Sequence, residues 1–298
     1  MGPSRVSDQP VPLTVTGPFH GEALLTFLAR HGVAATETWS DETGDAGRSI
    51  TYRRTMRLPH APAVMTLRWS ADTLGGWVDL GDQRDLEAGR ARLEHLCDLG
   101  VDVGAVEAHL ARDPQLRPLV SAASGLRVPG VVDLHEHLFR TMLGQQISLA
   151  GAANLAAKLV ARFGERLPDN RAGDAADPLT HLFPTAEALA GADPATLPMP
   201  RARGRALVLM AETLADGSLT LAPGCDPVET RARLLASPGV GPWTADYVLM
   251  RGLHLPDILL ASDLVIKREL LARELGATDR WSPWRSYATM HLWRAYTG

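Results

Sequence analysis

Lysine and cysteine are scarce in this sequence of 298 residues, and long apolar runs are absent. The two cysteines, Cys97 and Cys225, are far apart and fit no CxxC pattern, so neither a disulfide framework nor an iron–sulfur or zinc site is indicated. Arg, Asp or Gly interrupts each apolar stretch before the roughly 18 residues that a membrane span needs. The net charge of −4 lacks the basic surplus that usually accompanies nonspecific affinity for nucleic acid.

Apolar residues are plentiful by contrast. Hydrophobic residues make up 45% of the chain and charged residues 21%, which is typical of a globular protein with two or three packed units. Residues 1–10 lack the basic-then-apolar pattern of a signal peptide, and we therefore expect a soluble cytoplasmic protein. His135 and His137 flank Glu136, but on a helix they point to different faces, so we expect no metal site formed by side chains.

Hydrophobic periodicity divides the chain into two unlike parts. From residue 12 to about residue 85, one short amphipathic helix accompanies segments that alternate between polar and apolar, which indicates an α+β unit on an antiparallel sheet. After residue 85 the apolar residues recur at spacings of three and four, which predicts an almost wholly helical remainder. The expected strands are 49–58, 64–69 and 76–80, and the expected helices are 21–31, 133–143, 148–163, 185–190, 201–215, 227–236, 242–253, 263–275 and 283–296.

The most informative segment is the tetrapeptide Pro238, Gly239, Val240 and Gly241 between two expected helices. Its glycines allow a tight bend and present free backbone N–H groups at the start of the second helix. Such a helix start can bind a DNA phosphate without regard to sequence, with a monovalent cation between the backbone and the phosphate. An ordinary turn between two helices explains the tetrapeptide equally well.

The next helix and the loop after it add chemistry. Trp243 and Tyr247 lie four residues apart, on one helical face, where they could stack on a nucleobase rotated out of the duplex or simply pack in a core. Asp263 follows a mostly apolar segment and stands at the start of another expected helix, so it is either a catalytic carboxylate or only a helix cap.

Taken together these residues resemble the helix-hairpin-helix DNA glycosylases, and the whole chain resembles the AlkA-type family of 3-methyladenine DNA glycosylase II. Five stretches carry the resemblance in order: FLAR at 27–30, LGQQIS at 143–148, PGVGPWTADY at 238–247, WRSYA at 284–288 and HLW at 291–293. The resemblance implies an α+β N-terminal domain over 1–100, with an antiparallel sheet and helices similar to a TATA-binding-protein repeat. It further implies a helical domain over 129–254 that contains the hairpin, and a second one formed by 101–128 and 255–298.

The resemblance also implies roles for individual residues. It makes Asp263 the catalytic residue and places Trp243, Tyr247, Trp293 and Phe27 in the pocket for the base. The wedge that fills the gap left by the flipped base falls at Gln146 and Ile147, where the family's best-known member has leucine. His31 stands where that member carries arginine, which leaves the charge of the pocket open.

The implied activity is monofunctional hydrolysis of the N-glycosidic bond of alkylated purines in duplex DNA. Alkylation at N3 or N7 makes the departing base neutral, so the reaction chiefly needs an anion beside the cationic sugar and an aromatic pocket. Lys158 and Lys267 are the only lysines, and the position of the lysine that related lyases use is Trp243, so we expect no lyase activity. We expect a monomer that needs no cofactor and acts at the nucleoid.

Two other functions fit the same residues. A noncatalytic helix-hairpin-helix protein that binds DNA or senses damage would need the hairpin alone. A glycosylase for another damaged or mismatched base would keep the catalytic carboxylate. The sequence does not rank 3-methyladenine against 7-methylguanine, hypoxanthine or ethenoadenine.

Overall fold

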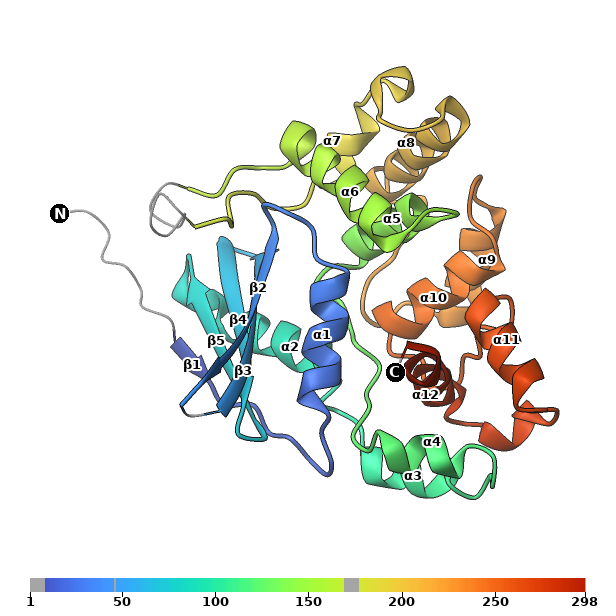
Figure 1. The fold of residues 1–298 in the computed structure, drawn as a ribbon. Coiled ribbons are helices and arrows are strands. Elements are labelled where there is room, and N and C mark those ends of the chain that lie inside the picture. The colour runs from blue at the N-terminus through green and yellow to red at the C-terminus, as the bar shows by residue number, and fades with distance from the viewer. Residues whose placement is uncertain (1–8, 46, 169–176, 298) are drawn as a thin grey trace.

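The computed structural model describes residues 9–45, 47–168 and 177–297, with an N-terminal sheet followed by helices (Figure 1). This arrangement confirms the predicted fold class. Most of the segment expected to lack a signal peptide, residues 1–8, lies outside the described residues. Among those that are described, no helix has both the length and the apolarity that a membrane crossing requires.

Within residues 9–45 and 47–168, the sheet has five antiparallel strands in the order β1-β5-β4-β3-β2. Their bounds are Gln9–Val11 for β1, Glu37–Gly44 for β2, Gly47–Arg57 for β3, Pro62–Ser70 for β4 and Thr73–Leu80 for β5. Alternation buries Tyr52 and Met65 against helices α1, Gly21–Arg30, and α2, Leu86–Leu96, in one shared core. The sequence prediction missed both edge strands, β1 and β2.

In the part of the chain that the structure describes, ten further helices follow α2, and Figure 1 shows them gathered on one side of the sheet. They are α3 Val103–Leu110, α4 Arg117–Ala122, α5 Leu134–Gly144, α6 Leu149–Phe163, α7 Ala186–Ala190, α8 Arg201–Ala215, α9 Pro227–Ala236, α10 Pro242–Gly252, α11 Leu264–Ala272 and α12 Arg285–Thr297. The short 3₁₀ turns are Gln83–Asp85, Pro194–Thr196 and Thr278–Trp281.

Two predicted helix ends differ from the structure by more than one residue. Helix α11 was expected to reach Leu275 but ends at Ala272, because the Leu275 amide bonds back to the Leu270 carbonyl and the Glu274 amide to that of Leu271. This is a Schellman ending, and its left-handed residue is Glu274, with φ of 54°, in place of the usual glycine. Helix α12 begins two residues after the expected Pro283.

Three large apolar clusters form the cores of the described chain. One joins the sheet to α1 and α2, one lies among α5 to α10, and one joins α3 and α4 to α11 and α12. They follow the order of the three predicted domains, while Val33, Val132, Tyr247 and Met250 pack across the predicted boundaries. The boundaries at residues 100, 128 and 254 stay predictions.

Candidate active site

Four N–H groups donate hydrogen bonds to the carboxylate of Asp263, the residue directly before α11. Its Oδ1 accepts hydrogen bonds from the backbone amides of Val265, at 2.9 Å, and Ile266, at 3.0 Å, so Asp263 caps the helix. The indole Nε1 of Trp243 donates to Oδ2 at 2.9 Å, and that of Trp293 donates to Oδ1 at 3.3 Å. Cap and indole contacts together fix the orientation of a half-buried anion.

The aromatic side chains predicted to receive a base form one group. Trp243 and Tyr247 stack with ring centroids 5.0 Å apart and planes at 22°, as their spacing on α10 predicts. Trp293 of α12 meets Tyr247 edge-on at 6.0 Å. Tyr247 is buried in the core, as one of the two alternatives for this pair expects, while Trp243 and Trp293 are half-buried. Stacking on a nucleobase stays a prediction.

A cavity of about 640 Å³ opens beside these rings. Its lining includes Trp243, Tyr247 and Trp293, together with Phe27 of α1 and His31, which directly follows α1. A purine needs only part of that volume. Asp263 is not itself among the lining residues, but its carboxylate accepts hydrogen bonds from two indoles that are, those of Trp243 and Trp293.

Arg251 is a further cavity residue that the sequence analysis missed. It is buried, and it donates to the Tyr247 hydroxyl at 2.9 Å and to the carbonyls of Pro129 and Gly130. Its guanidinium lies 4.9 Å from the centre of the Phe27 ring, and so ties the N-terminal unit to α10. The signal was present, since Arg251 follows Tyr247 by four residues on the same helical face.

The glycine-bent segment joins α9 to α10. Pro238, Gly239 and Gly241 are exposed, whereas Val240 is buried in the neighbouring core. Gly239 has a φ of 80°, and a Cβ at this position would meet the Cβ of Ala206 at 2.8 Å, so both conformation and space require glycine. Gly241 caps α10 without a side-chain hydrogen bond, and Pro242 follows at the first helical position. The exposed start of α10 suits an anion.

The predicted wedge lies in the loop between α5 and α6. Gln146 has a φ of 60° and is exposed, and the side chains of Ile147 and Leu149 are 38% and 51% exposed. The preceding Gln145 donates from Nε2 to the Gly239 carbonyl and to the Thr244 hydroxyl, both at 2.9 Å. This link between the loop and the hairpin was not foreseen.

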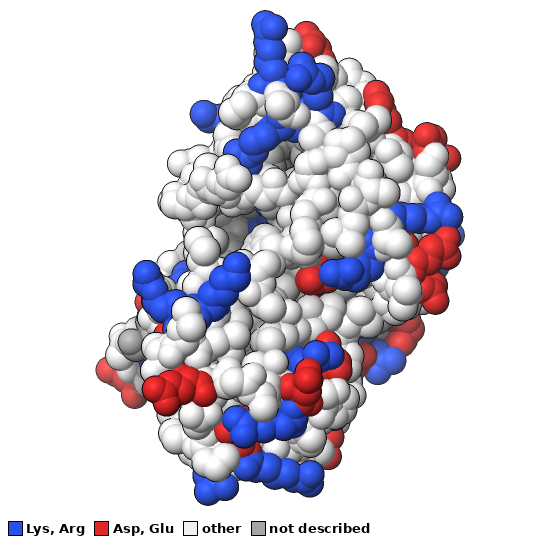
Figure 2. Space-filling model, turned by 90° about the vertical axis from the view of Figure 1, so that its right-hand side faces the viewer, with Lys and Arg blue, Asp and Glu red and all other residues white. Residues whose placement is uncertain are grey.

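Figure 2 shows the face of the molecule that lies on the right-hand side of Figure 1. Near its centre is a hollow of mainly uncharged surface, and both basic and acidic groups lie around it. Across the described residues, no three His, Cys, Asp or Glu side chains gather where a metal ion could bind.

Solved structures that resemble this fold include DNA glycosylases. The 3-methyladenine DNA glycosylase of Archaeoglobus fulgidus superposes with a TM-score of 0.74 at 20% identity, over 97% of this chain and 98% of that one. The 8-oxoguanine glycosylase/lyase of Clostridium acetobutylicum superposes with a TM-score of 0.71 at 14% identity, over the same shares. The fold is that of the DNA glycosylases, and it leaves open which base is removed and by what chemistry.

Sequence similarity narrows the class to a family. Residues 10–133 match the family model of the AlkA N-terminal domain. The chain is 33% identical to DNA-3-methyladenine glycosylase 2 of Escherichia coli, over 93% of this chain and 94% of that protein. It is 40% identical to the probable bifunctional transcriptional activator/DNA repair enzyme AlkA of Mycobacterium tuberculosis, of which it spans 56%. The chain therefore belongs to the AlkA family of DNA-3-methyladenine glycosylases.

Proposed function

We propose that this protein is a monofunctional DNA glycosylase that hydrolyses the N-glycosidic bond of alkylated purines flipped out of duplex DNA. The observation that carries the proposal is the hydrogen bonding of the Asp263 carboxylate to two indoles, Trp243 and Trp293, that line the aromatic cavity. An anion at the edge of a ring-lined space suits a reaction in which the sugar becomes cationic while a purine leaves.

Each predicted residue has a part in this reaction. The Trp243, Tyr247, Trp293 and Phe27 rings would bind the electron-poor purine by stacking. The Asp263 carboxylate would stabilise the oxocarbenium-like sugar and orient the attacking water. Because the alkylated purine leaves as a neutral base, no strong general acid is needed.

The lysines support hydrolysis over lyase chemistry. A lyase attacks the sugar with an amine and proceeds through a Schiff base. Lys158 and Lys267 are exposed, and neither belongs to the cavity lining. Sodium borohydride should therefore trap no covalent complex between this protein and damaged DNA, and a trapped complex would contradict the proposal.

DNA would bind across the hairpin and the wedge loop. The Pro238–Gly241 backbone would hold a phosphate, with a monovalent cation bridging the two, and Gln146 and Ile147 would fill the space left in the base stack. We propose that a monomer suffices and that no cofactor takes part. The protein would act on the nucleoid in the cytoplasm.

Base release from randomly methylated duplex DNA tests the proposal. Under single-turnover conditions, Asp263→Asn should slow the release of methylated purines by about 10²–10³, the range for losing one group that stabilises transition-state charge. The matched control is Asp279→Asn, because the Asp279 side chain is fully exposed and, among the described residues, pairs with Arg285 alone, at 3.9 Å; its rate should stay near that of the wild type.

The outcomes separate the alternatives. If the wild type binds damaged duplex but releases no base, it is a noncatalytic DNA-binding protein. If it releases only oxidised or mismatched bases from a substrate panel, it is a glycosylase of another specificity. If Asp263→Asn is as fast as the wild type, the catalytic assignment of Asp263 is wrong.

A further inference from the structure

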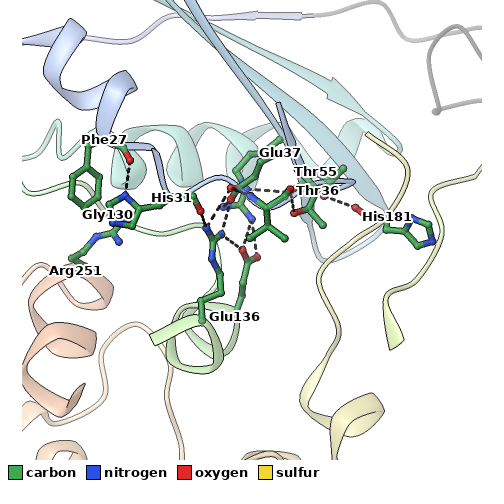
Figure 3. A network of polar contacts seen from close by, with 12 residues as sticks. Phe27, His31, Thr36, Glu37, Thr55, Gly130, Glu136, His181 and Arg251 are labelled. Atoms are coloured by element: carbon green, nitrogen blue, oxygen red, sulfur yellow. Dashed lines mark hydrogen bonds and ion pairs between the residues drawn. The ribbon is translucent and has the colours of Figure 1, made fainter. Parts of the chain in front are cut away.

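The two ring nitrogens of His31 differ in their hydrogen bonding, and only Nδ1 has a partner among the described residues. It follows the last residue of α1 and stacks on Phe27, with ring centroids 4.3 Å apart and planes at 30°. Its Nδ1 lies 2.7 Å from the Phe27 backbone carbonyl (Figure 3). A carbonyl oxygen only accepts hydrogen bonds, so the proton of a neutral His31 ring is on Nδ1.

The surroundings of His31 keep the ring neutral. Burial, followed by the positive charge of Arg251, lowers the pKa of His31 to about 4. Arg140 donates to the backbone carbonyl of His31 and so fixes the chain at this position. At neutral pH the Nε2 atom therefore carries a lone pair and no proton.

His31 is one of the residues that line the cavity, and its side chain is half-buried. Among the described residues, none forms a hydrogen bond with Nε2, and Nε2 is not one of the fully buried side-chain atoms left without a partner, so part of it is open to the space beside the ring. Its neighbour Arg251 can only donate hydrogen bonds, so the two side chains give this wall both an acceptor and a charge.

We propose that His31 selects among purines at their 6-position. Nε2 accepts a hydrogen bond from the 6-amino group of an adenine-derived lesion, and its lone pair repels the 6-oxo oxygen of a guanine-derived one. This inference rests on the proposed function, and it names the substrate class that the same cavity prefers, namely 6-aminopurines.

The matched substrates are 3-methyladenine and 7-methylguanine, because both are cationic methylated purines formed in the same methylated duplex. The ratio of their release rates, compared between variants, cancels the intrinsic lability of each bond. His31→Phe keeps a flat ring against Phe27 and removes the acceptor. We expect it to lower the 3-methyladenine to 7-methylguanine ratio about fivefold, which corresponds to one hydrogen bond of about 1 kcal/mol.

His109→Phe is the control, because His109 is half-buried on α3, does not line the cavity, and its side chain bonds to the Arg280 carbonyl; it should leave the ratio as in the wild type. An unchanged ratio in a folded His31→Phe variant overturns the inference about His31 and leaves the proposed function standing. A wild type that releases neither base overturns the proposed function instead.

Nitrogen-15 spectra of the wild type give a second test that needs no variant. The His31 signals should report a protonated Nδ1 and an unprotonated Nε2, and free 3-methyladenine should shift the Nε2 signal more than free 7-methylguanine does. A protonated Nε2 in the free protein, or equal shifts with both bases, overturns the inference.

Discussion

Removing Arg54 tests whether a buried ionic network holds the N-terminal sheet to the helical part of the chain. Arg54 of β3 contacts Glu37 at 3.0 Å and Glu136 of α5 at 2.7 Å (Figure 3). Arg140 contacts the same two carboxylates at 2.6 and 2.7 Å. Burial alone would raise the pKa of Glu37, but Arg140 and Arg54 outweigh it, and this pKa is lowered.

The four side chains are electrically balanced, with two positive and two negative charges. Arg54→Met leaves two buried carboxylates to share Arg140, so one negative charge loses its partner. Breaking a buried ion pair in this way costs about 3–5 kcal/mol, and Arg140 keeps the expected loss near the lower end, at about 3 kcal/mol. Adding Glu136→Gln restores neutrality, and the double variant should be more stable than Arg54→Met alone.

Urea unfolding, followed by circular dichroism, measures these free energies from the shift in midpoint at constant slope. The control is Arg57→Met on the same strand, because Arg57 pairs with Glu165 at the surface and its loss should cost less than about 1 kcal/mol. The reasoning is refuted if Arg54→Met costs no more than this control, or if the double variant is less stable than Arg54→Met.

Three further predictions concern the site and its surroundings. Trp243→Phe keeps an aromatic ring but loses the 2.9 Å hydrogen bond to Asp263, so single-turnover base release should fall about tenfold. Trp293→Phe loses a longer bond of 3.3 Å and should slow base release less; equal rates for the two variants would contradict this. Gly239→Ala should distort the bend, because Gly239 has a positive φ and no room for a Cβ, and should weaken the binding of undamaged duplex measured by fluorescence anisotropy. The control Gly191→Ala has open space for its Cβ and should bind as the wild type does; unchanged affinity in Gly239→Ala would show that the bend does not hold DNA. Burial lowers the pKa of His31, His254 and His291 to between about 3 and 4, so the stability that these neutral rings contribute is complete above about pH 6.5 and is lost as pH falls toward 4. Asp98, whose pKa burial raises to about 6, acts in the opposite direction below pH 6, but the three histidines outnumber it, and calorimetry should record a lower unfolding temperature at pH 5 than at pH 7.

Much of the fold could be predicted because its apolar periodicity is regular. Helices α8 and α9 begin and end at the predicted residues, since Pro or polar segments mark both ends of each. Strand β2 escaped prediction because it is an edge strand, and after Glu37 its residues are mostly exposed and show no apolar alternation. Strand β1 has only three residues, too few to form a pattern.

The site could be predicted in part, since its residues lie in short motifs at helical spacing. The stacked pair Trp243 and Tyr247 follows from its spacing on one helix. The contact of Trp293 with Asp263 joins two helices 30 residues apart, and local pattern does not encode such distances. The same holds for Arg251 and Phe27, whose contact depends on how the N-terminal unit packs on α10.

The side-chain amide of Gln145 has a mechanical consequence. It fastens the loop that carries Gln146 to both the bend at Gly239 and the first turn of α10 at Thr244. The bend proposed to bind a phosphate and the loop proposed to enter the base stack are thus linked to each other within the free protein. If both segments bind DNA as proposed, their arrangement is already set in the folded chain, and less conformational freedom is lost on binding.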